Sequence, residues 1–111
     1  MIENYTKIYF IGIGGIGMSS IALYFLDKGK TVGGYDKTKT DLTINLENHG
    51  ALIHYDLKIS KIPLEFSNKQ DTLIIYTPAI SKDNIELDFF INNSYKLLKR
   101  SEALGLISKN K

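Results

Sequence analysis

Short runs of β-branched and aromatic residues alternate along this chain with stretches in which apolar residues recur every three or four positions. Residues 7–11 (Lys-Ile-Tyr-Phe-Ile) are the first such run and predict a buried strand. From Met18 to Leu26 the apolar side chains recur at helical spacing, which predicts an amphipathic helix. Gly29 follows at the position where a glycine commonly ends a helix.

The same alternation continues to the end of the chain, except in residues 56–70, where neither period is clear. Strands that alternate with helices are typical of a parallel sheet. The sequence therefore predicts an α/β fold: one doubly wound parallel sheet of about five strands in the order 3-2-1-4-5, with helices on both faces. The further predicted strands are 31–35, 51–55, 71–76 and 95–98, and the further predicted helices are 41–49, 83–92 and 101–107.

Individual side chains carry expectations within these helices. In helix 41–49, Leu42 and Leu46, with Ile44 beside them, are expected to face the core. Asp83 or Asn84 is expected to cap the helix 83–92. Ser101 is expected to be the N-cap of the last helix, with an acidic residue in its first turn.

Four glycines in six residues, at positions 12–17 (Gly-Ile-Gly-Gly-Ile-Gly), end the first strand pattern. The string matches G-x-G-x-x-G and lies between a predicted strand and a predicted helix, the context that gives this motif its meaning. In the motif the first glycine permits a tight turn, the second lets a phosphate approach the backbone, and the third lets the helix pack closely on the strand. Because the N–H groups at the start of a helix carry partial positive charge, the loop is expected to bind an anion.

An acidic residue follows the loop at the spacing that nucleotide binding requires. Asp36 ends the second predicted strand about 20 residues further on, where its carboxylate accepts hydrogen bonds from ribose hydroxyls. We therefore expect a phosphorylated nucleotide as ligand, with Ser19 and Ser20 as further donors, and the motif alone leaves open which nucleotide. Residues 29–31 (Gly-Lys-Thr) resemble the end of an ATP-binding P-loop, but Tyr24 stands where that motif needs glycine, so no ATP-binding loop is predicted.

Length and composition exclude several classes of protein. The 111 residues suit a single domain, and their net charge of +2 comes from scattered lysines, so no nucleic-acid partner is expected. Cysteine is absent, which excludes disulfides and thiolate metal sites. No apolar run reaches the roughly 18 residues of a membrane span, and residues 1–7 lack the order of a secretory signal, so a cytoplasmic protein without a membrane partner is expected. His49 and His54 lack companion ligands at a recognisable spacing and are expected to be surface or cap residues, so no metal site is predicted.

Longer strings of this sequence resemble the Mur ligases. They occur in order across roughly residues 7–107, and the doubled glycine at 14–15 together with Met18 and Ser19 is more specific than G-x-G-x-x-G alone. The strings are 10–19 (Phe-Ile-Gly-Ile-Gly-Gly-Ile-Gly-Met-Ser), 33–36 (Gly-Gly-Tyr-Asp), 76–80 (Tyr-Thr-Pro-Ala-Ile) with 83–84 (Asp-Asn), and 99–104 (Lys-Arg-Ser-Glu-Ala-Leu).

The resemblance implies that residues 1–111 are a single Rossmann-like domain at the N-terminus of a longer ligase. In that family this domain binds the UDP part of the substrate, which is expected here to be UDP-N-acetylmuramate, and the ATP-binding and C-terminal domains lie beyond it. The resemblance implies that the full-length enzyme would use ATP and Mg²⁺ to add L-alanine during bacterial peptidoglycan synthesis. No cofactor and no catalytic residue is then expected in this chain, which is expected to be inactive by itself.

The resemblance also implies the residues of the UDP site. The glycine loop would meet the diphosphate, Asp36 and its neighbours the ribose or the base, and the turn after the fourth strand would line a crevice at the carboxyl ends of the strands. For Arg100 two interpretations stay open: a contact with the ligand, or a solvated residue before the last helix. The expected UDP-binding residues are Gly12, Gly14, Gly15, Ile16, Gly17, Met18, Ser19, Asp36, Lys37, Thr38, Thr77, Pro78, Ala79 and Ile80.

Two other functions share parts of this pattern. A regulatory domain that senses NAD(H), like those attached to ion channels and transporters, has the same glycine loop and the acid after the second strand. It does not readily explain the full glycine-loop string together with residues 77–80. A homologous ligase that recycles a muramyl tripeptide shares both the fold and the UDP end of the substrate.

Overall fold

A parallel sheet organises the chain in the computed structural model, which describes residues 2–81 and 83–109. Within these residues the sheet has five strands in the order β3-β2-β1-β4-β5, and every pairing is parallel, which confirms the predicted topology. The strands are β1 (Lys7–Ile11), β2 (Thr31–Tyr35), β3 (Leu52–His54), β4 (Thr72–Tyr76) and β5 (Lys96–Lys99).

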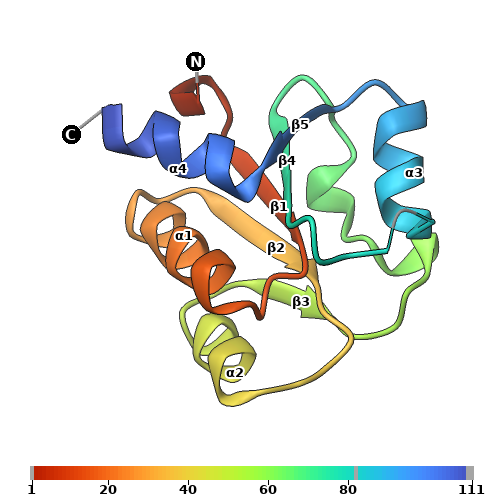
Figure 1. The fold of residues 1–111 in the computed structure, drawn as a ribbon, viewed down its shortest axis with the longest axis horizontal. Coiled ribbons are helices and arrows are strands. Elements are labelled where there is room, and N and C mark those ends of the chain that lie inside the picture. Colours follow the sequence, from red (N-terminus) through yellow and green to blue (C-terminus); the bar gives the residue numbers. More distant parts are fainter. Residues whose placement is uncertain (1, 82, 110–111) are drawn as a thin grey trace.

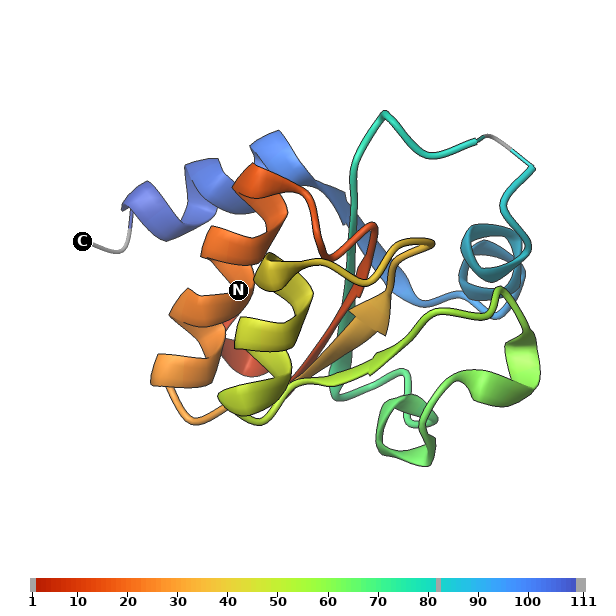
Figure 2. The same cartoon turned by 90° about the horizontal axis from the view of Figure 1, so that it is seen from below.

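Helices cover both faces of this sheet (Figures 1 and 2). Three of them, α1, α2 and α4, lie together on one face, whereas α3 and two short 3-10 segments lie on the other. The 3-10 segments occupy the stretch 56–70, which explains why its sequence shows neither the strand nor the helix period. The helices are α1 (Ile16–Asp27), α2 (Asp41–Asn48), α3 (Ile85–Asn92) and α4 (Arg100–Lys109), and the 3-10 segments of this stretch are Ile59–Lys61 and Leu64–Phe66.

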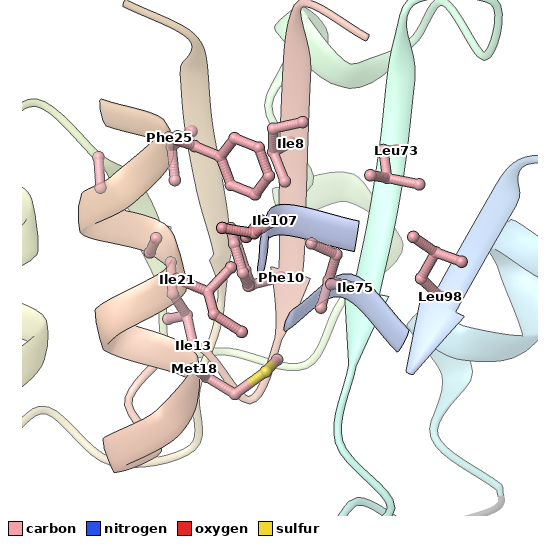
Figure 3. Packing of buried hydrophobic residues seen from close by; sticks show 14 of the residues in the cluster. Ile8, Phe10, Ile13, Met18, Ile21, Phe25, Leu73, Ile75, Leu98 and Ile107 are labelled. Carbon is pink, nitrogen blue, oxygen red and sulfur yellow. The ribbon is translucent and has the colours of Figure 1, made fainter. Parts of the chain in front are cut away.

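Two hydrophobic clusters form, one on each face, because successive side chains of a strand point to opposite sides. Ile8 and Phe10 of β1 belong to the cluster under α1 and α4, and Tyr9 and Ile11 to the cluster under α3. In Figure 3 side chains of α1 and α4 point toward β1 and β4 from one side. The residues labelled there are Ile8, Phe10, Ile13, Met18, Ile21, Phe25, Leu73, Ile75, Leu98 and Ile107.

Two glycines of β2 allow the chain to pass close to its neighbours. A Cβ atom on Gly34 would lie 2.3 Å from the carbonyl oxygen of Phe10, and one on Gly33 would lie 2.6 Å from the carbonyl oxygen of Leu52. Both contacts involve backbone atoms, which cannot move aside cheaply. The glycine pair that the sequence places in this strand therefore has a structural reason.

Helix α2 turns a threonine rather than two of its aliphatic residues toward the core. Leu46 is fully buried as predicted, but Leu42 and Ile44 are each 39% exposed. The buried residue is Thr43, whose hydroxyl accepts from the Thr40 N–H at 2.9 Å while the Thr43 N–H donates to the Thr40 hydroxyl at 3.3 Å. This capping box sets the phase of the helix, which the apolar pattern alone misjudges.

Of the two N-cap predictions, the one for the helix 83–92 is confirmed and the one for the last helix is wrong. Asn84 caps α3, its side-chain oxygen accepting from the N–H groups of Glu86 and Leu87 at 2.9 and 3.1 Å. The N-cap prediction for Ser101 is wrong, because α4 begins one residue earlier, at Arg100. The carboxylate of Glu102 there accepts from the Lys99 N–H at 2.8 Å.

Candidate functional site

The glycine loop begins with a backbone turn that only glycine adopts readily. Gly12 has φ +88°, in the left-handed region. Its N–H and that of Ile13 both donate to the carbonyl oxygen of Tyr35, at 2.8 and 3.1 Å. The Gly15 N–H then donates back to the Gly12 carbonyl oxygen at 3.2 Å. These bonds fasten the loop to the end of β2 and orient the chain for entry into α1.

The N-terminus of α1 presents backbone donors that nothing in the described part of the domain uses. The first helical hydrogen bond runs from the Ser19 N–H to the Gly15 carbonyl oxygen, at 2.8 Å. The N–H groups of Ile16, Gly17 and Met18 precede that bond, and no hydrogen bond between residues 2–81 and 83–109 occupies them. Gly15, the N-cap, has no side chain with which to cap them. The positive end of the helix dipole is therefore open to an anion.

Asp36 holds the loop through its carboxylate. Its Oδ2 accepts from the Gly14 N–H at 2.8 Å and its Oδ1 accepts from the Thr38 N–H at 3.0 Å. A Cβ on Gly14 would lie 2.8 Å from Asp36 Oδ2, so this glycine admits the carboxylate of the chain itself rather than a phosphate. Each carboxylate oxygen keeps a second lone pair, which a ribose hydroxyl can use.

A cleft of about 610 Å³ opens beside this carboxylate, at the carboxyl ends of β1, β2 and β4. It lies where the strand order reverses, the position at which open α/β sheets bind ligands. One wall comes from the glycine loop, one from the end of β2, and one from the segment after β4. The lining residues are Gly12, Gly15, Tyr35, Asp36, Lys37, Leu57, Thr77, Ala79, Ile80, Ser81 and Asn84.

Seven of the fourteen residues expected from the sequence line this cleft, and the other seven lie around it. Ile16 is 83% exposed at the helix start, and Pro78 is exposed beyond β4. Met18 is buried in the core below the loop. Ser19 is also buried, and its hydroxyl donates to the Ile16 carbonyl oxygen at 3.0 Å instead of facing a ligand. The remaining three are Gly14 and Thr38, which bond to Asp36, and Gly17, which lies against Arg100.

A buried polar network behind one wall of the cleft is absent from the sequence-based expectations. The Tyr9 hydroxyl donates to Glu86 Oε1 at 2.6 Å, and His54 Nε2 lies 2.6 Å from Glu86 Oε2. Tyr9 and Glu86 are fully buried, and burial, reinforced by the Glu86 carboxylate, raises the pKa of Tyr9 well above its ordinary value. The network joins β1, β3 and α3, and Asn84, which starts α3, lines the cleft.

The expectation that both histidines are surface or cap residues is wrong for His54. Its side chain is only 12% exposed, because the end of β3 lies under α3, and its Nδ1 is buried with no partner among the described residues. His49 matches the expectation: it is exposed at the end of α2 and its Nδ1 lies 2.8 Å from the Asn45 carbonyl oxygen. A sequence signal for the network existed in Glu86, an acidic residue between two apolar ones, but an acid in a first helical turn has a simpler explanation.

The described part of the chain contains neither a metal-binding cluster nor a membrane-spanning helix. No three His, Asp or Glu side chains among residues 2–81 and 83–109 gather as a metal-binding group. None of the helices in these residues has the length and apolarity that crossing a bilayer requires.

The fold and the cleft define a class: Rossmann-like domains that offer a glycine loop and a strand-end carboxylate to a nucleotide. Residues 7–111 match the model of the Mur ligase family, catalytic domain. The chain therefore belongs to the Mur ligase family.

Two of the curated relatives are UDP-N-acetylmuramate–L-alanine ligases. The UDP-N-acetylmuramate–L-alanine ligase of Parabacteroides distasonis is 47% identical over 109 residues, 98% of this chain and 24% of the relative. That of Cytophaga hutchinsonii is 50% identical over 108 residues, 97% of this chain and 23% of the relative. The chain thus spans about a quarter of the length of these curated relatives.

Solved structures agree. The crystal structure of the UDP-N-acetylmuramate–alanine ligase from Thermotoga maritima matches with a TM-score of 0.82 and 30% identity, over 94% of this chain and 23% of that one. A murein peptide ligase from Psychrobacter arcticus matches with a TM-score of 0.75 over 89% of this chain and 20% of that one. At 22% identity the second match shows the fold alone.

Proposed function

We propose that this chain binds the UDP part of UDP-N-acetylmuramate, as the N-terminal domain of an ATP-dependent ligase that adds L-alanine to that substrate in peptidoglycan synthesis. The observation that carries the proposal is the open N-terminus of α1, next to a cleft that Gly15 and Asp36 line. A diphosphate is the part of this substrate that such a terminus would attract. The 47% and 50% identity to ligases of that name supports the choice of nucleotide.

The cleft would accommodate the remaining parts of the nucleotide. The free lone pairs of Asp36 would accept from the ribose hydroxyls. Ile80 and Leu57 offer apolar contacts for the base, with Thr77 beside them. Lys37 at the rim would add positive charge for the phosphates. Gly14 and Thr38, which line no wall, would act through their bonds to Asp36, which hold the loop in place.

The chemistry of the reaction belongs to the rest of the ligase. ATP and Mg²⁺ would be bound by the ATP-binding domain, and the C-terminal domain would complete the site for the amino acid. This chain would contribute substrate binding and no catalytic residue, and by itself it would be inactive. Because both ATP and nucleotide-activated sugars are cytoplasmic metabolites, the ligase would work in the cytoplasm. The family match over residues 7–111 favours this function over an NAD(H)-sensing domain.

A titration followed by amide NMR tests the proposal. UDP-N-acetylmuramate is expected to shift the signals of residues 14–19 and 36–38, whereas ATP and NADH are expected to leave them unchanged. Binding of NADH at these residues, without any response to the uridine nucleotide, would refute the proposed function.

A pair of glycine variants sharpens the test. A Cβ on Gly15 meets nothing closer than 3.6 Å, and its φ of −63° suits any residue, so Gly15→Val is expected to fold. Its branched side chain would stand between the ligand and the N–H groups of α1, and we expect at least a tenfold loss of affinity. Gly105→Val, on the exposed side of α4 with open space around it, is the matched control and should bind like the unmodified chain. Normal binding by Gly15→Val would contradict the placement of the diphosphate.

A further inference from the structure

The third glycine of the loop makes room for an arginine. A Cβ on Gly17 would lie 2.9 Å from Arg100 Nη1 and 3.1 Å from its Cδ. Arg100 is the first residue of α4, directly after β5, and α4 packs beside α1 on the same face of the sheet (Figure 2). The expected role of this glycine, close packing of the helix on the strand, is therefore replaced by a contact between the loop and a cationic side chain.

The guanidinium of Arg100 has no acidic partner in the described residues. Arg100 is half-buried, and no hydrogen bond or ion pair joins its guanidinium to the part of the chain that the structure describes. The nearest acid in sequence, Glu102, is engaged with the Lys99 N–H. An arginine head group has five donors in a planar fork that matches two oxygens of a phosphate or a carboxylate. A half-buried fork without such a partner is suited to an anion from outside the domain.

The position of Arg100 determines which part of the ligand it would meet. The cleft with Asp36 reaches the loop at Gly12 and Gly15. Arg100 lies further along the loop, at Gly17, where it borders a separate hollow of about 260 Å³ between α1 and α4. A ligand whose nucleoside fills the cleft and whose first phosphate meets the start of α1 would extend past Gly15 toward this side.

We propose that Arg100 is a further substrate-binding residue, which pairs with an anionic group beyond the first phosphate of the nucleotide. The inference rests on the proposed UDP binding and adds to it a cation outside the cleft. The substrate offers two such groups, the second phosphate and the carboxylate on the sugar, and both present the oxygen pair that the guanidinium fork recognises.

A series of four ligands distinguishes whether the second phosphate or the sugar carboxylate is the partner of Arg100. Uridine monophosphate, UDP, UDP-N-acetylglucosamine and UDP-N-acetylmuramate are titrated by amide NMR into the unmodified chain and into Arg100→Gln. If the partner is the second phosphate, the variant binds the monophosphate within twofold of the unmodified chain, and the other three ligands bind at least tenfold more weakly. If the partner is the carboxylate, only UDP-N-acetylmuramate loses affinity. Lys96→Gln, an exposed cation at the other end of β5, is the control for the change in net charge.

The outcomes that overturn the inference differ from the one that overturns the function. Unchanged affinity of Arg100→Gln for all four ligands, or an equal loss that includes the monophosphate, refutes the role of Arg100 beyond the first phosphate. Failure of the unmodified chain to bind any of the four ligands refutes the proposed function instead.

A double-mutant cycle tests whether the contact with Gly17 matters. Gly17→Ala would push aside the flexible end of Arg100 at little cost to the fold, because the atom in the way belongs to a movable side chain. We expect Gly17→Ala to weaken UDP binding in the unmodified chain and to add no further loss in Arg100→Gln. Fully additive losses would show that the two residues act independently and would contradict the proposed arrangement. Thermal unfolding of each variant verifies that the fold is retained.

Discussion

The backbone N–H of Gly14 donates to Oδ2 of Asp36 at 2.8 Å, so the acid after β2 holds the loop after β1. In the dinucleotide-binding motif each of these two residues is expected to contact a different part of the ligand, the glycine a phosphate and the acid a ribose. In the structure they are bound to each other, and the Thr38 N–H adds a second bond to the same carboxylate. The loop is thereby fixed before any nucleotide arrives, which lowers the ordering cost of binding.

Replacement of this acid should weaken both the fold and the binding of the nucleotide. Asp36→Ala removes both acceptors and is expected to lower the free energy of unfolding by about 1–2 kcal/mol. We expect the affinity for UDP to fall at least tenfold, because the loop loses its anchor and the ribose loses its acceptor. Asp27→Ala, at the exposed C-terminal end of α1, makes the same change in charge away from the site and should alter neither. Urea unfolding and NMR titration measure the two effects, and unchanged UDP affinity in Asp36→Ala would exclude the proposed role.

The glycine pair in β2 should be essential for stability. Gly34→Ala places a methyl group where 2.3 Å separates it from the Phe10 carbonyl oxygen, so β1 and β2 would have to separate. We expect a loss of about 2–3 kcal/mol or failure to fold. Gly105→Ala, in open space on α4, should instead stabilise the chain by about 0.5–1 kcal/mol, because alanine is the better helix former. Denaturant unfolding compares the two variants, and equal stability would contradict the close approach of the strands.

The carboxylate of Glu86 should contribute strongly to stability. Glu86→Ala removes the carboxylate that accepts from the Tyr9 hydroxyl and pairs with His54 Nε2, and leaves these two buried groups only their mutual contact at 3.4 Å, so we expect a loss of about 3 kcal/mol. Glu86→Gln keeps the shape and an acceptor oxygen, so it should cost less. Glu65→Ala, on the surface of the segment Leu64–Phe66, is the control and should stay within about 0.5 kcal/mol of the unmodified chain. Urea unfolding measures the loss. A loss in Glu86→Ala no larger than that of the Glu65→Ala control would show that the network contributes nothing to stability.

Alkaline pH should destabilise the chain through its tyrosines. Burial, with the negative charge of Glu86, raises the pKa of Tyr9 above its ordinary value near 10. The folded state therefore keeps a proton that the unfolded state loses, so the stabilisation is complete below pH 10 and declines as the pH rises further. One such group contributes a slope of up to about 1.4 kcal/mol per pH unit. Burial also raises the pKa values of Tyr35, Tyr55 and Tyr95, so they should add to the decline.

A tyrosine variant isolates the largest contribution. Tyr9→Phe is expected to lower stability near neutral pH, because Glu86 loses a donor, and to reduce the decline above pH 10. Urea unfolding of both proteins between pH 8 and pH 11 measures the slopes. Parallel curves for the two proteins would show that Tyr9 ionises alike in the folded and unfolded states.

The sequence by itself determined the order of strands and helices, the glycine loop and the place of Asp36. Each of these depends on a local pattern: the apolar period distinguishes strand from helix, and glycines between the two mark the turn. Parallel strands also bring their carboxyl ends to one edge, so the strand order alone assigns residues 12–17, Asp36 and residues 77–80 to one edge of the sheet, where seven of the fourteen expected residues line the cleft. The apolar pattern was less informative for helix α2. There a capping box between Thr40 and Thr43 determines which side of the helix faces the core, and Thr43 is buried.

The tertiary structure alone decided which side chains meet. Glu86 reaches Tyr9 across 77 positions of sequence, and Arg100 lies on Gly17 although different strands and helices carry them. Such pairs depend on how α3 packs against the sheet and on how α4 packs beside α1, and no periodicity in the chain specifies these contacts. An acid in a first helical turn or a base before a helix has the same local pattern whether it faces water or a buried partner. A polar side chain that is buried cannot be solvated by water, so it needs a partner within the protein or a ligand. That partner then affects the stability and the function of this domain.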